Sequence, residues 1–460
     1  MFSLEQRQEL LHRPLMGLYP QFIQRFFLPL YYGLRGRHYA RYRRLLEHSQ
    51  WWSREELLAF QWSELSPLLD HVFAHVPYYR QKYQAAGIQR GDIRDLADFA
   101  RLPVLTREEI RAHREELRAV NVAQLLPHAT GGSSGAPTRF YITRDSYDWR
   151  TAATHRAYSW SGVGLGQLTL YLWGAPIGTP PRWKLAKVHA FNALQRQEIV
   201  STFSQSPALW QRIYEWQRRH RPALIVGYVS SLEAYAEYLA AHALTPPPPP
   251  RAVISAAEPL PAATRRRIEA SLAAPVFNTY GSREFMSIAA ECSAHSGLHL
   301  HAENLVVESA LPAAAGASDI LVTDLHNYGM PFLRYAIGDL GVLDDAPCEC
   351  GRGLPRIGAI EGRALEVLRT PDGRVVPGEI FPHLMKEFPE IREFQARQLA
   401  LDHIVISAVL DQPLSAAHRE LMESELHKVF GAGLRIDLER VDTIPPLASG
   451  KRRVTIGMGG

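Results

Sequence analysis

The chain has 460 residues, of which 46% are hydrophobic and 21% charged, a composition that is ordinary for a globular protein of two or three domains. No apolar run approaches the roughly 20 residues that a transmembrane helix needs. The charged first residues do not resemble a secretory signal, and three cysteines are too few for a disulfide scaffold. We therefore expect a cytoplasmic protein without a membrane span.

The net charge of +4 is unevenly distributed. Residues 1–50 contain eight arginines against three glutamates, a net charge of +5, and include the aromatic stretch FIQRFFLPLYYGL. We interpret residues 1–50 as a basic helical arm packed on the body of the protein. Contact of the arm with a peripheral membrane surface, an acidic protein or another subunit stays open as the alternative. No recognised nucleic-acid module is present, so nucleic-acid binding is not expected.

Residues 51–120 are predicted to be mainly helical. A helix begins after Ser53, with Glu56 three residues later to complete a capping box, and the helical pattern stops at Gly87. Thr106 repeats the start signal in TREEIRAHREEL. After a glycine-rich loop, RFYIT (139–143) has the aromatic and β-branched composition of a strand.

Between about residues 150 and 290, strand-like runs such as LTLYLWG and RAVISAA alternate with helical runs such as SLEAYAEYLAAH. This alternation predicts a parallel sheet with crossover helices. A smaller β region follows to about residue 345, and the last hundred residues predict a compact α+β unit. The fold class is therefore α/β: a large N-terminal domain (51–362) with mixed or parallel sheets and a β subdomain, and a small, mobile α+β C-terminal domain (363–460).

The loop TGGSSGAPTRF (130–140) is compatible with two chemistries. It matches G-x-S-x-G, the elbow that presents a nucleophilic serine, here Ser133, in many hydrolases. An elbow must lead straight into a helix, however, and here Pro137 and a predicted strand follow. The loop also lacks the Gly-Lys-Ser/Thr of nucleotide hydrolases. Its backbone amides and hydroxyls can still bind phosphate, and the loop alone does not separate phosphate binding from an ordinary flexible hairpin.

Four further stretches accompany this loop in order: NTYGSREF (278–285), TDLHNYGMPFLRYAIGDLG (323–341), IEGRALEV around Arg363, and PPLASGKRRVTI around Lys451. Together they resemble the adenylate-forming superfamily of acyl-CoA synthetases and adenylation domains. The pattern is most similar to the phenylacetate–coenzyme A ligase branch and its relatives in capsular polysaccharide gene clusters. The resemblance runs from about Ser53 to Lys451.

This resemblance implies a ligase that couples a carboxylic acid to ATP and passes the acyl group of the resulting acyl-adenylate to a thiol such as coenzyme A. Lys451 would bridge the substrate carboxylate and the α-phosphate, and Glu284 would hold Mg²⁺. The other residues implied to bind the nucleotide are Thr130, Gly131, Gly132, Ser133, Ser134, Gly135 and Thr138 at the phosphates, Ala257, Glu258 and Tyr280 at the adenine, Ser282 by the α-phosphate with Gly281 before it, Asp339 at the ribose, and Arg363 at the ribose or phosphate side.

Two departures from the family pattern keep a second hypothesis open. Thr138-Arg139 stands where the family loop usually carries a lysine. The family hinge usually has an acidic residue shortly after its Gly-Arg pair, and here Ala364 and Leu365 intervene before Glu366, the only candidate. The chain could therefore be an adenylation-like scaffold that binds nucleotide without turnover in a polysaccharide assembly complex. A serine hydrolase using Ser133 is a third hypothesis.

Aromatic residues in 172–176 and 227–231 could line a pocket for an aryl or apolar acid. The alternative is that these side chains only pack in the core. The sequence does not specify which acid is used, whether the acceptor is a thiol, a sugar hydroxyl or an amine, or the oligomeric state.

The three cysteines suggest a metal site. Cys348 and Cys350 form a C-x-C pair, and Cys292 precedes His295, His299 and His301. Three cysteines and one histidine are a ligand set that structural zinc prefers, and the resemblance favours His299 as the fourth ligand. The alternative is a set of reduced thiols in a β region.

Overall fold

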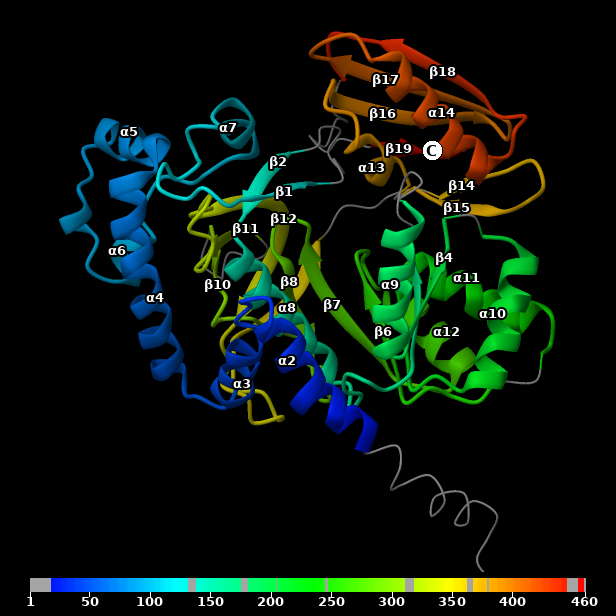
Figure 1. Cartoon of the computed structure of the whole chain (residues 1–460), viewed down its shortest axis with the longest axis horizontal. Coiled ribbons are helices and arrows are strands. Elements are labelled where there is room, and N and C mark those ends of the chain that lie inside the picture. Colours follow the sequence, from blue (N-terminus) through cyan, green and yellow to red (C-terminus); the bar gives the residue numbers. More distant parts are fainter. Residues whose placement is uncertain are drawn as a thin grey trace, which may run out of the picture.

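The computed structural model describes residues 18–130, 138–174, 181–203, 205–244, 247–310, 318–361, 367–378, 380–444 and 454–458. A large mixed sheet runs through the body, helices cover it, and a smaller sheet with its own helices stands at one end (Figure 1). This arrangement confirms the α/β class with a small α+β unit at the C-terminal end.

The N-terminal part is helical. Its elements are η1 (Ile23–Phe27), α2 (Leu28–Gly33), α3 (Tyr39–Ser49), α4 (Arg54–His75), α5 (Pro77–Ala85), η2 (Arg90–Asp92), α6 (Leu96–Phe99) and α7 (Arg107–Ala112). The capping box of Ser53 and Glu56 is present at the start of α4. The helical run to Gly87 breaks at Val76, because Pro77 has no N–H to continue the α4 ladder and instead begins α5.

One half of the large sheet is parallel, as predicted. Its strands lie in the order β4-β3-β5-β6-β7. They are β3 (Thr169–Trp173), β4 (Gln197–Ser201), β5 (Leu224–Tyr228), β6 (Ala252–Ala256) and β7 (Val276–Ser282), connected or covered by α8 (Arg144–Ser159), α9 (Arg182–Leu194), α10 (Pro207–His220), α11 (Val229–Ala241) and α12 (Ala262–Leu272). All residues of β5 and β6 are buried, as expected for parallel strands covered on both faces.

The other half is antiparallel and continues the same ladder, because β7 pairs with β8. The strands are β8 (Met286–Glu291), β9 (Leu298–Leu300), β10 (Leu305–Ser309), β11 (Ser318–Asp324), β12 (Tyr335–Asp344) and β13 (Arg356–Glu361), in the order β8-β9-β13-β12-β11-β10. A separate hairpin of β1 (Leu126–Ala129) and β2 (Arg139–Ile142) lies beside it. The predicted β region is therefore an extension of the main sheet.

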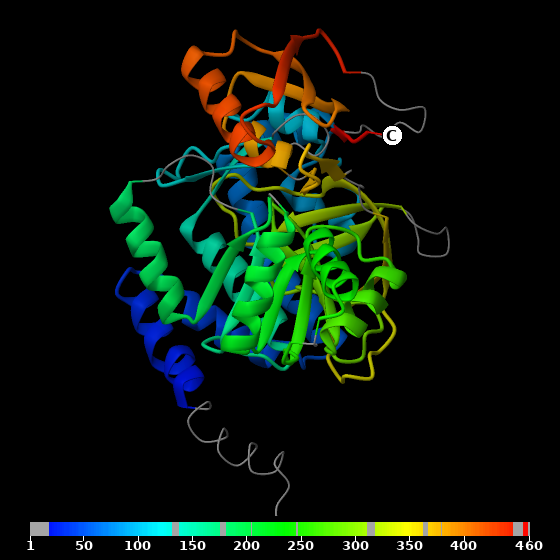
Figure 2. The same ribbon diagram turned by 90° about the vertical axis from the view of Figure 1, so that its right-hand side faces the viewer.

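The C-terminal unit has its own sheet in the order β18-β17-β16-β19. Its elements are β14 (Val367–Arg369), β15 (Val375–Pro377), α13 (Ile380–Met385), β16 (Ile391–Ala400), β17 (His403–Leu410), α14 (Ala416–Phe430), β18 (Arg435–Arg440) and β19 (Thr455–Ile456). Figures 1 and 2 show this unit at one end of the molecule, away from the N-terminal arm. The domain boundary expected near Gly362, and Glu366 beyond it, lie outside the described residues.

Within the described ranges, no helix combines the length and the hydrophobicity that crossing a membrane requires.

Candidate functional site

Two of the motif residues meet where the halves of the large sheet join. Tyr280 lies near the end of β7, and its hydroxyl donates a hydrogen bond to Asp339 Oδ2 in β12 at 2.9 Å. Strands β7 and β12 are not neighbours in the ladder, so this contact reaches across the face of the sheet. The structure thereby brings together a ring expected at the adenine and a carboxylate expected at the ribose.

Glu284 follows β7 directly and is only 3% exposed. The hydroxyl of Tyr335 donates to Glu284 Oε1 at 3.2 Å, and Arg107 Nη2 lies 3.9 Å from the same oxygen. Arg107 also donates to the Tyr335 hydroxyl and interacts electrostatically with Asp339. Burial raises the pKa of the Tyr335 phenol, so the phenol stays protonated and acts as a donor. Glu284 is thus a buried carboxyl group held by one guanidinium and one phenol.

Arg107 and Tyr335 belong to this cluster of contacts, and the sequence did not single them out. Arg107 is the first residue of α7, where the Thr106 capping box was the only evident signal. Tyr335 lies in the same quoted stretch as Asp339, but its strand pattern indicated only a core position. Their shared contact joins residues 228 positions apart, which no local pattern reveals.

The turn between β7 and β8 has little freedom. A Cβ on Gly281 would lie 2.0 Å from the carbonyl oxygen of Met286, so only glycine fits at this position. The Ser282 hydroxyl oxygen is buried and has no hydrogen-bond partner among the described residues. A buried, unsatisfied hydroxyl is costly, and a bound phosphate oxygen or water would satisfy it.

Thr130 and Thr138 close the base of the glycine-rich loop. The Thr130 amide donates to the Thr138 carbonyl at 2.9 Å, and the Thr138 amide donates to Thr130 Oγ1 at 2.8 Å. The loop joins two paired antiparallel strands, β1 and β2. A nucleophile elbow leads from a strand into a helix, so this hairpin disfavours the hydrolase hypothesis. The loop residues between the two threonines lie outside the described residues; those expected at the phosphates are Gly131, Gly132, Ser133, Ser134 and Gly135.

The segment expected beside the adenine follows β6. Ala257 adopts a left-handed backbone conformation with φ of 68°, which is uncommon outside glycine and is often found at functional sites. The Glu258 carboxylate accepts hydrogen bonds from the backbone amide and the hydroxyl of Ser230, the latter at 2.9 Å. Burial raises the pKa of Glu258. In this structure Glu258 caps the first turn of α11, which fixes the path of the segment.

The C-terminal unit packs on the carboxyl ends of the parallel strands (Figure 1). Tyr228, at the end of β5, is buried in one hydrophobic cluster with Phe381 of α13. Arg139 Nη2 donates to the carbonyl of Lys386 at 2.9 Å. The residue that replaces the expected loop lysine therefore connects the hairpin to the C-terminal unit.

The aromatic side chains suggested for an acid pocket lie in the same interface. The rings of Trp173 and Tyr228 stack with centroids 4.4 Å apart, and both pack against the hydrophobic cluster of the C-terminal unit. In this arrangement both rings pack against other protein side chains, which agrees with the alternative that they belong to the core.

His383 of α13 lies in this interface, facing Arg283, the Tyr228 hydroxyl, the Phe203 ring and Lys386. Burial, and then the nearby Arg283 and Lys386, hold the pKa of His383 well below its ordinary value of 6.5.

We expect the packing of the C-terminal unit to weaken as the pH falls below 6.5. When the C-terminal unit separates, His383 regains its ordinary pKa and below pH 6.5 binds a proton that it does not bind in the interface. The stability of the packed state is therefore unaffected by His383 above pH 6.5 and falls below that pH. His383→Gln should flatten this pH dependence of the thermal unfolding midpoint, whereas His242→Gln, at an exposed position, should not. If the unfolding midpoints of both variants depend on pH equally, His383 is not the cause of this pH dependence.

Four side chains converge at the opposite end of the antiparallel half. The candidate ligand atoms of Cys292, His299, Cys348 and Cys350 all lie within 4.8 Å of one another. The Sγ atoms of Cys292 and Cys348 are 3.7 Å apart, which is too long for a disulfide, and Cys350 Sγ lies 3.3 Å from His299 Nε2. Burial lowers the pKa of His299 to about 4, so its imidazole is neutral. These four residues could hold a metal ion.

The neighbouring histidines have other partners. His295 Nδ1 contacts the Glu291 carboxylate, and His301 Nε2 contacts the Ser287 hydroxyl at 2.8 Å. His299 instead turns Nδ1 to the Leu354 carbonyl at 3.0 Å, which leaves Nε2 toward the cysteines.

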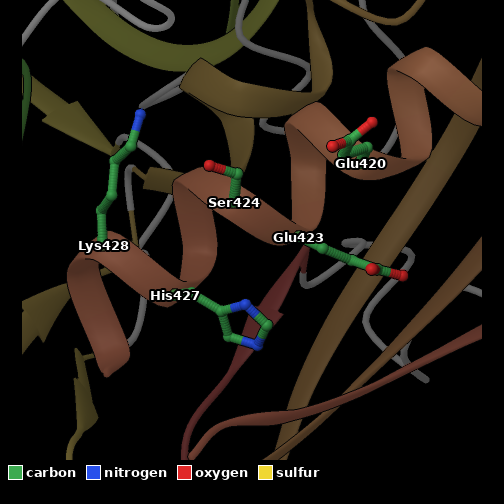
Figure 3. Close-up of a pocket in the computed structure, with 5 residues that line it drawn as sticks. All are labelled: Glu420, Glu423, Ser424, His427 and Lys428. Atoms are coloured by element: carbon green, nitrogen blue, oxygen red, sulfur yellow. The ribbon is translucent and has the colours of Figure 1, made fainter. Parts of the chain in front are cut away.

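A surface pocket elsewhere is formed by one helix, α14, of the C-terminal unit (Figure 3). It is lined by Glu420, Glu423, Ser424, His427 and Lys428. None of the motif residues lines it, so it is not the candidate site. Lys451 and Arg363 lie outside the described residues.

Residues 368–457 match the family described as the CapK C-terminal domain. Over most of its length the chain is 25% identical to the phenylacetate–coenzyme A ligase of Thermus thermophilus, covering 78% of this chain and 83% of that protein. It is 23% identical to Protein CapK of Staphylococcus aureus, covering 78% and 80%.

The fold is similar to that of 2-hydroxyisobutyryl-CoA ligase, solved in complex with 2-HIB-AMP and CoA in its thioesterification state. The TM-score is 0.57 with 21% identity, over 88% of this chain and 91% of that one. The resemblance to adenylate-forming ligases, in the branch of phenylacetate–coenzyme A ligases and CapK, is confirmed.

Proposed function

We propose that the protein activates a carboxylic acid with ATP as an acyl-adenylate and transfers the acyl group to a thiol such as coenzyme A. The observation that carries this proposal is the convergence of Tyr280, Glu284 and Asp339, which contact one another directly or through Arg107. Arg283, the residue before Glu284, contacts His383 of the C-terminal unit. The curated relatives named as coenzyme A ligases and the solved neighbour with an acyl-AMP and CoA support the same reaction.

Adenylation requires a carboxylate anion to attack an anionic phosphate, so the site must supply positive charge. In the proposed mechanism the loop from Thr130 to Thr138 encloses the β- and γ-phosphates, and Ser282 hydrogen-bonds near the α-phosphate. Lys451 offsets the charge that builds up between the two reacting groups. Tyr280 packs on the adenine, and Asp339 accepts the ribose hydroxyls. Arg363 would meet the ribose or the phosphates, and Ala257 and Glu258 would border the base.

Glu284 fits the role of a Mg²⁺ ligand. Carboxylate and phosphate oxygens are the hard ligands that Mg²⁺ prefers. Glu284 is buried and follows Ser282 by two residues, and the buried Ser282 hydroxyl has no partner among the described residues. Bound Mg²⁺ would neutralise phosphate charge. Tyr335 and Arg107 would hold the Glu284 side chain in its position.

We further propose that the cysteine cluster binds structural Zn²⁺. In a tetrahedral site with Zn–S bonds of about 2.3 Å, sulfur atoms lie about 3.8 Å apart, and Cys292 and Cys348 lie 3.7 Å apart. The hydrogen bond from His299 Nδ1 to Leu354 is the typical outer contact that orients a zinc-binding imidazole.

Asp339→Ala is expected to raise the KM for ATP by about tenfold to a hundredfold, because it removes two charged hydrogen bonds to the ribose. The KM for the acid should change much less. Tyr280→Phe is the matched control, since it removes the Asp339 contact but keeps the aromatic ring, and its KM for ATP should rise only slightly. Steady-state kinetics measures both. Equal KM values for ATP in wild type and Asp339→Ala would exclude the ribose role.

A screen of isotope exchange between ATP and pyrophosphate over aryl, fatty, amino and hydroxy acids tests the proposal. At least one acid should support exchange, and Lys451→Ala should lower it strongly with that acid. Tight ATP binding without exchange for any acid would favour the scaffold hypothesis instead.

A further inference from the structure

The outer face of the N-terminal arm carries a row of exposed apolar side chains. Their exposed fractions are 63% for Leu18, 49% for Phe22, 65% for Phe26, 62% for Leu30 and 77% for Leu34. These residues recur at every fourth position of a helical segment, where side chains are neighbours on the surface, and the rings of Phe22 and Phe26 stack. Soluble proteins rarely expose so continuous an apolar row without a binding role.

The inner face of the arm already fixes it to the body. Ile23 and Leu28 are fully buried in a cluster with Trp149 of α8. Arg37 donates to the buried Asp148 at 2.6 Å. The outer row is therefore not needed to hold the arm in place.

Helix α9 lies beside the arm and extends the same surface. The rings of Tyr31 and Phe191 are 4.8 Å apart, and the Tyr19 hydroxyl donates to the carbonyl of Leu194. On its outer face α9 exposes Trp183 and Val188, at 65% and 54%. In Figure 2 the arm and α9 lie along the same side of the molecule.

The charge of residues 18–44 and of α9 has one sign. Residues 18–44 contain six arginines and no acidic residue, and α9 contains three cations and no acidic residue. The exposed cations are Arg25, Arg35, Arg41, Arg44, Lys184 and Lys187. The acids beside these residues are already engaged: Asp148 pairs with Arg37 and Glu47 with Arg43. Asp145 accepts from the Tyr42 hydroxyl and contacts His38. The surface thus combines apolar rings with positive charge.

We propose that the arm and α9 together bind the surface of an anionic lipid bilayer. Exposed phenylalanine, leucine and tryptophan side chains enter the boundary between headgroups and acyl chains, and the cations contact lipid phosphates. A second copy of the chain on a twofold axis would place arginines against arginines, which is unfavourable. This inference does not depend on the reaction proposed above.

The test is cosedimentation of the full-length protein with vesicles of phosphatidylcholine and phosphatidylglycerol, compared with phosphatidylcholine alone. We expect binding to the anionic vesicles that weakens with added salt. Each arginine changed to glutamine should weaken it about fivefold, so the triple variant R25Q/R35Q/R41Q should bind about a hundredfold more weakly. The apolar variant F22S/F26S/L30S should also lose binding. The control V120S/L399S/L401S, with exposed apolar side chains elsewhere, should bind like wild type.

Unchanged thermal unfolding midpoints verify that the variants fold. Absence of wild-type binding to anionic vesicles at low salt would overturn the proposal. Equal binding by wild type and F22S/F26S/L30S would do so as well. If that variant instead dissociated an oligomer in analytical ultracentrifugation while its vesicle binding stayed unchanged, a second copy would occupy the surface and the proposal would be wrong.

Discussion

Glu284→Gln is expected to lower the rate of acid-dependent ATP–pyrophosphate exchange by about 100-fold to 1,000-fold, the usual cost of removing one preorganised charge contact from a transition state. The substitution keeps the shape of the side chain and its contact with Tyr335, but removes the negative charge that holds Mg²⁺. Exchange measured over a Mg²⁺ titration should show that the variant needs far more Mg²⁺ than wild type.

Glu308→Gln is the matched control for this loss. Glu308, in β10, is also a largely buried carboxylate and pairs with Arg334. Its hydrogen bonds in the described structure are to Arg334 and not to a proposed nucleotide residue. This variant should lose stability while its exchange rate and Mg²⁺ requirement stay those of wild type. If the exchange rate of Glu284→Gln depends on Mg²⁺ concentration as in wild type, Glu284 is not the Mg²⁺ ligand.

Loss of the cysteine cluster is expected to lower stability strongly, because a structural zinc site contributes its binding free energy to folding. The double variant Cys348→Ser/Cys350→Ser should bind no zinc and unfold several degrees below wild type. The effect should spread to the arm, because the loop after Cys350 contacts it: Gly353 donates to the Gln50 carbonyl, and Arg352 to the Gln50 side chain.

Metal content by mass spectrometry, together with thermal unfolding, checks this result. Wild type should carry one zinc per chain, and His295→Asn, which changes a neighbouring histidine outside the cluster, should retain it. A zinc-free wild type with the same unfolding midpoint as the double variant would mean that the cysteines are reduced thiols in the β region.

Local signals predicted much of the fold. Capping residues marked the starts of α4 and α7, and alternating strand and helix patterns indicated the parallel half of the sheet. Strand β16 was not predicted, although it lies between two partners in the C-terminal sheet. Its buried positions Ile391, Phe394 and Ala396 are separated by charged and polar residues and interrupted by a register shift, which conceals the alternation.

The candidate site was predictable as a set of residues but not as a geometry. Motif order singled out Tyr280, Glu284 and Asp339, whereas the support of Glu284 by Arg107 and Tyr335 arises only when distant segments pack. The contact of Arg139 with the C-terminal unit is likewise tertiary, and it gives a structural context for the arginine that stands where a lysine was expected.

The most direct test of the central claim is the nucleotide product formed with an acid that the exchange screen identifies. In the presence of that acid, coenzyme A, ATP and Mg²⁺, we expect AMP and pyrophosphate to appear in equal amounts with the acyl thioester. Without coenzyme A, mass spectrometry should detect the acyl-adenylate bound to the protein. Formation of ADP and phosphate, or a thioester without AMP, would contradict an adenylating mechanism.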